Sequence, residues 1–347
     1  MRLALVPALA LCPLLALGLA GPARSADEWP HETLCRTLVK TAVPKQDIGT
    51  APAECDTQTL YYGSDGKGAG RDYAAARRCA YRERGTGQGI ETQSAPFGGS
   101  GALMMLYANG QGVKRNIPLA KRFACEYGGA PAEVEGRLDR LDAIAKGADK
   151  RALDICDEVT SGMMMGVCAG READFAKAGR DGRMAALQAS WTPAQREAWA
   201  ALRKAADEYF ENVSGEETDM SGSARGMFAV EAGEKLEVAL LDAVTRFEGG
   251  KRPTQKAADF ARADKALNAT YKQTLAKLDA ARAGDGMGDY GTLSSEGVRT
   301  TQRSWLRYRD AWVRFAAARW PGTSADAWKA WLTAGRNEAL KALTTQD

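Results

Sequence analysis

The sequence has almost no histidine and none of the short signatures that mark common catalytic sites. His31 is the single histidine in 347 residues, and no nucleophile elbow, H-E-x-x-H or Walker pattern occurs. His31 forms no recognisable relay with the serines, so we interpret it as an exposed side chain near the N-terminus. Carboxylates are numerous but follow helical patterns typical of solvated faces, which neither locates nor excludes a glycosidase pair. The sequence therefore predicts a protein that is not an enzyme and needs no cofactor.

Blocks of like charge and long apolar runs are also scarce. The chain has 47 Lys and Arg against 44 Asp and Glu, which gives no reason to expect binding to nucleic acid or a membrane surface. One long apolar run, residues 3–20, follows Arg2 and precedes small residues, so residues 1–25 are expected to be a secretory signal. Cys12 could indicate a lipid anchor, but the leucine before it is not the small residue that such a site requires. We predict a periplasmic or secreted protein, cleaved between residues 20 and 26, without a membrane span.

Six of the seven cysteines lie beyond the predicted signal, all in the first half of the chain. An even number in an exported protein predicts three disulfides, and the sequence alone does not choose among the possible pairings. A zinc site is the alternative, but there is no C-x-x-C and only one histidine. We expect disulfides and no metal; the six residues are Cys35, Cys55, Cys79, Cys125, Cys156 and Cys168.

Residues 60–81 and 106–127 look like two copies of one helical hairpin, with a period of about 44–46 residues. Each has a Leu-Tyr helix, a glycine-bearing turn and a second helix that Asp72 or Asn116 caps. One hairpin cannot bury its apolar face alone, so neighbouring hairpins must stack. The form Y-A-N-G-x-G-V-x-x-N-x-x-x-A in the second copy resembles a Sel-one-like repeat. The resemblance implies a solenoid-like α/α region over residues 30–150 that serves protein–protein contact.

The glycine-rich residues 97–101 could suggest a phosphate-binding loop. No lysine follows them and no apolar strand precedes them. A linker is therefore the favoured interpretation.

Patterns of large apolar residues predict a helical bundle in the last third of the chain. Apolar side chains recur every three or four positions over residues 260–278. In the next helix Trp305 and Trp312 are seven residues apart with Tyr308 between them, so one face carries several aromatic rings. Ser324 is expected to cap a third helix. Burying each ring contributes roughly 2–3 kcal/mol, so these helices should pack together.

The motifs A-D-x-x-L-N-x-x-Y and T-Q-R-x-W-x-x-Y-R-D, with a closing Thr333, Arg336 and Leu340, resemble the lysozyme-inhibitor LprI N-terminal domain family of bacterial envelope proteins. The resemblance covers residues 257–343 and implies an all-α domain over residues 255–347. That family usually has a cysteine after the R-D pair and another in the closing helix, and here we expect apolar packing in their place. The motif residues are Asp264, Leu267, Asn268, Tyr271, Gln302, Trp305, Arg309 and Asp310.

Four polar residues of these motifs are candidates for a network across the bundle. Asp264 and Asn268 lie one helical turn apart, and Arg309 and Asp310 are expected to interact with them. We favour a structural network that orients two helices. The alternative is a ligand-facing site.

Residues 156–248 look like an earlier, more diverged copy of the same unit. Thr192 begins a capping box with proline at the first helical position, which predicts a helix start. The W-x-x-x-R spacing is the same in both copies, so the resemblance implies a tandem, with a diverged domain over residues 151–250. The corresponding residues are Gln195, Trp199 and Arg203 in the first copy and Gln302, Trp305 and Arg309 in the second.

Cys156 and Cys168 bracket one short segment and resemble the paired cysteines that open the family pattern, so we expect them to form a disulfide. Residues 211–226 are acidic and rich in small residues, which predicts a mobile loop between helices. We hypothesise that this loop reaches a cationic partner such as a lysozyme, and a solvated connection is the alternative. The candidate binding residues are Glu216, Glu217, Asp219, Ser221 and Ser223.

Two functions remain after these observations. The LprI-like resemblance implies an exported protein that inhibits lysozyme by direct contact. The Sel-one-like resemblance implies a non-inhibitory scaffold that binds other proteins of the cell envelope.

Overall fold

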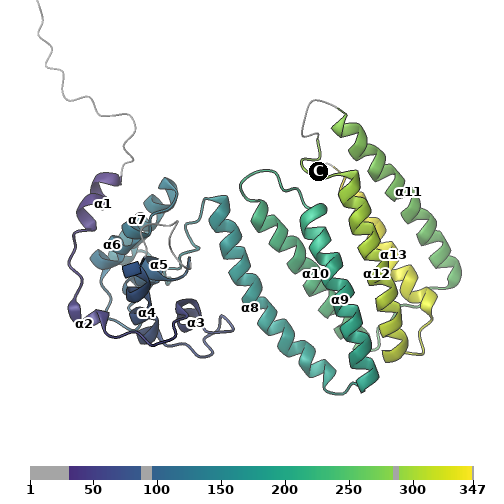
Figure 1. The fold of residues 1–347 in the computed structure, drawn as a ribbon, viewed down its shortest axis with the longest axis horizontal. Helices are drawn as coiled ribbons and strands as arrows, with labels where there is room; N and C mark the ends of the chain where they lie inside the picture. The colour runs from purple at the N-terminus through teal and green to yellow at the C-terminus, as the bar shows by residue number, and fades with distance from the viewer. Residues whose placement is uncertain (1–30, 87–95, 284–288, 346–347) are drawn as a thin grey trace, which may run out of the picture.

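The computed structural model describes residues 31–86, 96–283 and 289–345. Over these ranges the chain forms thirteen helices and no strand, which confirms the predicted all-α class (Figure 1). The predicted signal segment and Cys12 lie outside the described residues. No helix within the described ranges is both long and apolar enough to cross a membrane.

The first seven helices pack around one core of tyrosine, leucine, methionine and alanine side chains. The hairpin predictions agree with the helix boundaries, because Asp72 accepts a hydrogen bond from the backbone N–H of Ala75 and Asn116 accepts one from Leu119. The assignment of these hairpins to Sel-one-like repeats stays a prediction. The helices are α1 (Glu32–Leu38), α2 (Lys45–Ile48), α3 (Thr57–Tyr62), α4 (Tyr73–Thr86), α5 (Gly99–Asn109), α6 (Ile117–Tyr127) and α7 (Pro131–Ala145).

The linker predicted for residues 97–101 is wrong. Gly99 begins α5, and this helix is buried from Gly99 to Ala108. A Cβ on Gly101 would lie 2.7 Å from Ile155 Cδ1 and 3.0 Å from the ring of Tyr127. Gly101 is therefore needed for close helix packing at the centre of this core.

All six cysteines of the described residues are paired in disulfides, so the zinc alternative is wrong. The predicted Cys156–Cys168 bond is confirmed, and the other bonds are Cys35–Cys125 and Cys55–Cys79. Disulfides of this kind are typical of proteins from oxidising compartments.

The second half of the chain consists of six long helices, which we divide into the first triplet, α8 to α10, and the second triplet, α11 to α13. In each triplet the first and third helices pack side by side, and the middle helices α9 and α12 pack on each other (Figure 1). The helices are α8 (Gly162–Gln188), α9 (Pro193–Glu216), α10 (Arg225–Glu248), α11 (Ala257–Arg282), α12 (Ser295–Arg319) and α13 (Ala325–Ala342).

Helices α9 and α12 run antiparallel. The start of α9 meets the end of α12, where Gln195 Nε2 donates to the Ala318 carbonyl at 3.1 Å. Farther along, the rings of Tyr209 and Tyr308 stack with centroids 5.3 Å apart. The middle helix of each triplet therefore packs antiparallel on the middle helix of the other. A duplicated three-helix unit would produce this arrangement, although the tandem itself stays a prediction.

The two triplets share a single aromatic core. Trp305 is 2% exposed and Trp312 is 0% exposed, as the sequence pattern predicted. This core runs from Trp191 before α9 to Leu340 in α13, so its apolar surface is removed from water by both triplets together.

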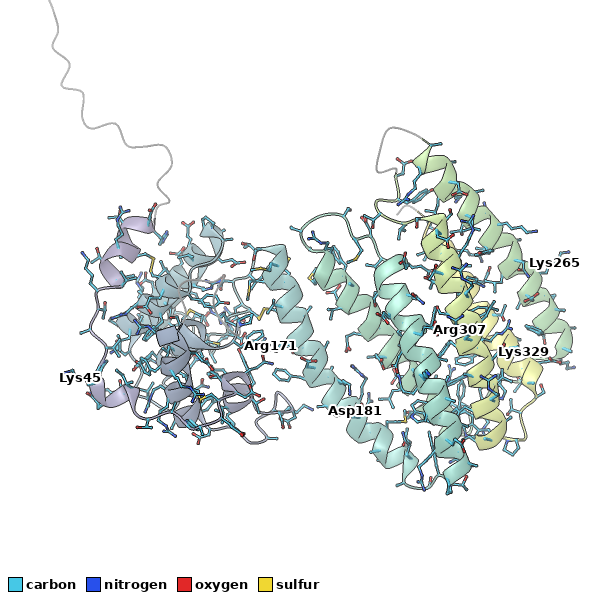
Figure 2. All side chains as sticks on the ribbon, in the orientation of Figure 1. Lys45, Arg171, Asp181, Lys265, Arg307 and Lys329 are labelled. Atoms are coloured by element: carbon cyan, nitrogen blue, oxygen red, sulfur yellow. A yellow bond between two sulfur atoms is a disulfide. The ribbon has the colours of Figure 1, made fainter. Side chains whose placement is uncertain are left out.

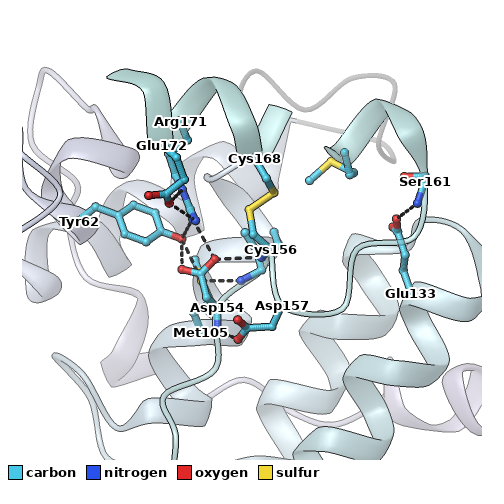
Figure 3. Close-up of a disulfide and its surroundings, with 12 residues drawn as sticks. Tyr62, Met105, Glu133, Asp154, Cys156, Asp157, Ser161, Cys168, Arg171 and Glu172 are labelled. Carbon is cyan, nitrogen blue, oxygen red and sulfur yellow. Dashed lines mark hydrogen bonds and ion pairs between the residues drawn. A yellow bond between two sulfur atoms is a disulfide. The ribbon is translucent and has the colours of Figure 1, made fainter. Parts of the chain in front are cut away.

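Helix α8 joins the two halves of the molecule. Val167 and Phe175 pack on the N-terminal core, whereas Met184 and Leu187 pack on the aromatic core. Figure 3 shows how its first turns are held: beside the Cys156–Cys168 bond, Arg171 Nη1 donates to Tyr62 Oη at 2.7 Å and to Asp154 Oδ1 at 2.9 Å. The disulfide and the buried arginine therefore attach α8 to the N-terminal helices.

Candidate partner-binding site

The large motif residues of the second triplet lie inside the protein. Leu267 and Trp305 are buried, and Tyr271 packs against the aromatic core. The guanidinium of Arg309 lies over the ring of Trp305, 5.3 Å from its centroid. These side chains stabilise the bundle and are not available to a partner.

A buried ion pair joins the two triplets. Arg336 of α13 donates from Nη1 to Glu217 Oε2 at 2.7 Å and from Nη2 to Oε1 at 2.5 Å. Its Nε donates to Gln302 Oε1 at 2.9 Å. Burial alone would lower the pKa of Arg336, but the hydrogen bonds and charge of Glu217 outweigh it and raise that pKa. The motif residue Gln302 and the closing Arg336 thus hold the end of α9.

Glu217 is therefore wrong as an exposed binding residue. It is 8% exposed, and its partner Arg336 lies 119 positions away in the sequence. The loop predicted over residues 211–226 is also wrong at both ends. Residues 211–216 complete α9 and Arg225 begins α10, which leaves a connection of residues 217–224.

This connection is bonded to the segment that precedes α12. Asp219 accepts hydrogen bonds from the backbone N–H of Ser221 at 3.0 Å and of Thr292 at 2.9 Å. These and the Ser221 hydroxyl lower the pKa of Asp219 to about 2, so its carboxylate is ionised at neutral pH. Glu216 and Ser223 are exposed beside it. Glu216, Asp219, Ser221 and Ser223 remain predicted contact residues, and we name these four the 217–224 rim, after the connection that holds three of them and directly follows Glu216.

The polar network predicted between Asp264, Asn268, Arg309 and Asp310 is wrong. Asn268 donates to Asp264 within α11, at 3.1 Å to Oδ2. Arg309 pairs with its neighbour Asp310 at 3.0 Å. The four side chains bond within their own helices, and Gln302 makes the contact that crosses the bundle.

The corresponding residues of the first triplet have different partners. Thr192 and Gln195 form the predicted capping box, which is confirmed. Trp199 is buried, but Arg203 lies over Phe210 and forms an ion pair with Glu237 through two contacts of 2.8 Å. The shared W-x-x-x-R spacing therefore does not produce the same arginine contact in both triplets.

A pocket of about 480 Å³ lies between α8, α9 and α10. Trp199 and Leu240 are among the apolar residues that line it, and the ion pairs Arg180–Glu234 and Arg203–Glu237 are among its polar groups. Sequence reasoning missed this pocket because no local pattern indicates that α8 pairs with α10.

The two triplets carry opposite charge. The first triplet, residues 162–248, contains fifteen Asp and Glu against ten Lys and Arg, a formal charge of −5. The second triplet, residues 257–342, contains nine Asp and Glu against fourteen Lys and Arg, a formal charge of +5. The near-neutral total of the whole chain conceals this difference, which a count by region reveals.

The second triplet is thus a set of three helices whose motif residues hold helices together. Residues 254–344, about a quarter of the chain, match the family model described as "Lysozyme inhibitor LprI". The match spans α11 to α13 and confirms the resemblance that the sequence motifs predicted over residues 257–343. No curated protein and no solved structure matches the chain.

Proposed function

We propose that this protein is an exported, periplasmic or secreted protein-binding protein that inhibits lysozyme by direct contact. The match of residues 254–344 to the lysozyme-inhibitor family is the observation that carries this proposal. The three disulfides support export, because such bonds persist in oxidising compartments.

The contact face that we propose is the 217–224 rim, on the acidic first triplet. A C-type lysozyme is cationic, so the first triplet, with a formal charge of −5, attracts it whereas the second triplet, at +5, repels it. In this arrangement the family-matched triplet contributes indirectly, because its Arg336 fixes Glu217 at the base of the rim.

Inhibition is tested with purified mature protein and a C-type lysozyme acting on a turbid cell-wall suspension. Replacing Glu216 by Gln together with Asp219 by Asn is expected to weaken inhibition about three- to tenfold, because exposed charge contacts contribute roughly 0.2–1 kcal/mol each. The inhibition should also weaken as salt is added, since exposed charges are screened.

The matched control is Glu197→Gln, which removes one exposed carboxylate at the opposite end of α9. It should change inhibition by less than about twofold. If the rim and control variants lose inhibition equally, the rim is not the contact face. No inhibition by the unaltered protein would reject the function itself and favour the alternative, a non-inhibitory envelope scaffold that binds proteins through its N-terminal helices.

A further inference from the structure

We propose that a basic groove on the N-terminal helices binds an acidic peptide segment of a partner protein. This site lies outside the family-matched residues and does not depend on lysozyme inhibition. We name it the Arg115 groove.

The groove consists of two adjoining pockets. The larger, of about 680 Å³, lies between the α2 region, the start of α6 and the end of α7. The smaller, of about 320 Å³, lies between the α5–α6 turn and residues 147–152. Arg115 and Ile144 line both pockets, so the two pockets are neighbours.

Three cations of the groove lack protein partners. Lys114, Arg115 and Lys150 are exposed, and none of them forms an ion pair or a side-chain hydrogen bond among the described residues. Lys146 is a further exposed cation between two lining residues, Ala145 and Gly147. The groove therefore presents positive charge that is not neutralised within the protein.

The two carboxylates that line the groove are already engaged. Asp47 accepts a hydrogen bond from Tyr107 Oη at 2.8 Å. Asp149 is paired with Arg151 at 2.7 Å and with Arg140 at 3.4 Å, and the hydrogen bonds from Arg151 hold its pKa well below the usual range. Asp149 is thus balanced by arginines, and the phenol that bonds Asp47 carries no charge, so Lys114, Arg115 and Lys150 stand against the single carboxylate of Asp47.

The larger pocket also has apolar lining residues. Pro44, Val113, Ile117 and Pro118 line it beside the cations. α6 begins at Ile117, and the positive end of its dipole adds to the potential there. Carboxylates of a peptide would pair with the cations, and aliphatic side chains between them would contact the apolar lining residues. The groove therefore suits an extended acidic peptide that also contains leucine or isoleucine.

The test measures binding of a fluorescent peptide of alternating glutamate and leucine to the full mature protein with its disulfides intact. The triple variant Lys114→Glu, Arg115→Glu, Lys150→Glu is expected to weaken binding at least about tenfold, because three attractive contacts become repulsive. A peptide with glutamine in place of glutamate should bind the unaltered protein about as weakly.

The matched control is Lys251→Glu, Lys265→Glu, Lys272→Glu, which changes the charge equally. Lys265 lies on α11, at the far end of the molecule from Lys45, the neighbour of the groove residue Pro44 (Figure 2). Binding by this control should change less than about twofold.

Three results would overturn the proposal. The first is equal loss in both triple variants, which would mean that net charge alone attracts the peptide. The second is equal binding of the glutamine peptide. The third is displacement by inorganic phosphate or by phosphatidylglycerol vesicles as readily as by unlabelled peptide, which would indicate a general anion site. All substituted residues are exposed. Circular dichroism of each variant, including a single Arg115→Gln variant, checks that the fold is unchanged.

Discussion

At the residue scale, the Arg336–Glu217 pair decides how the two triplets are joined. Arg336 is 2% exposed and Glu217 is 8% exposed, and each supplies the opposite charge and the hydrogen-bond partner of the other in the protein interior. Removing one partner leaves an uncompensated buried charge. Replacing both partners by apolar groups removes the free-energy cost of burying two charges together with the attraction between them.

We therefore expect Arg336→Met to lower the free energy of unfolding by about 3–5 kcal/mol. The double variant Arg336→Met, Glu217→Leu should recover much of that loss. Urea denaturation followed by circular dichroism measures both. A double variant that is as unstable as the sum of the two single variants would contradict the pairing.

Sequence reasoning succeeded at residues whose roles depend on neighbours in the chain. Trp305 and Trp312 were predicted as core from their spacing, and Gln195 from its capping box. It failed for Glu217, because no pattern of adjacent residues indicates a partner on a helix far along the chain. Of the five candidate binding residues, Glu217 is thus structural, and the other four stay predictions.

At the scale of elements, the crossing of α8 and α10 depends on glycine. A Cβ on Gly162 would lie 2.0 Å from the backbone of Ser223, just before α10, and a Cβ on Gly166 would lie 3.4 Å from the carbonyl carbon of Gly226. The two backbones can approach this closely only because no side chain separates them.

Gly162→Ala is accordingly expected to destabilise the protein by about 1–3 kcal/mol, because the helices must move apart. Gly179→Ala in the same helix has open space around its Cβ and should stabilise by about 0.5–1 kcal/mol. Chemical denaturation of the two variants compares them directly. If both variants change the free energy of unfolding in the same direction, the crossing of α8 and α10 does not depend on close backbone contact at Gly162.

Most helices were predictable from periodicity and caps, and the main error shows the limit of composition. Residues 211–216 contain serine, glycine and glutamate, which favour a loop. In the structure Val213 packs on the aromatic core and the helix continues to Glu216. Tertiary contact overrode the local preference, as it often does at helix ends.

At the scale of the whole molecule, the disulfides close chain segments of very different length. The Cys35–Cys125 bond spans 90 residues and the Cys156–Cys168 bond spans 12. The restriction of the unfolded chain is greater for the longer segment.

The double variant Cys35→Ser, Cys125→Ser is thus expected to lose about 4–5 kcal/mol of stability, against about 3 kcal/mol for Cys156→Ser, Cys168→Ser. Calorimetric melting of the three proteins at one pH gives the comparison. A larger loss for the shorter bond would mean that its attachment of α8 matters more than chain entropy.

The span of α8 has a further consequence for how this protein could act. Its 27 residues extend about 40 Å without a break, with one end fixed on the N-terminal helices and the other on the aromatic core. α8 is therefore a rigid connection between the two halves, not a flexible linker. Two molecules bound at opposite ends of the protein would keep a fixed distance and orientation. Inserting one or two residues into α8 would rotate one bound molecule relative to the other.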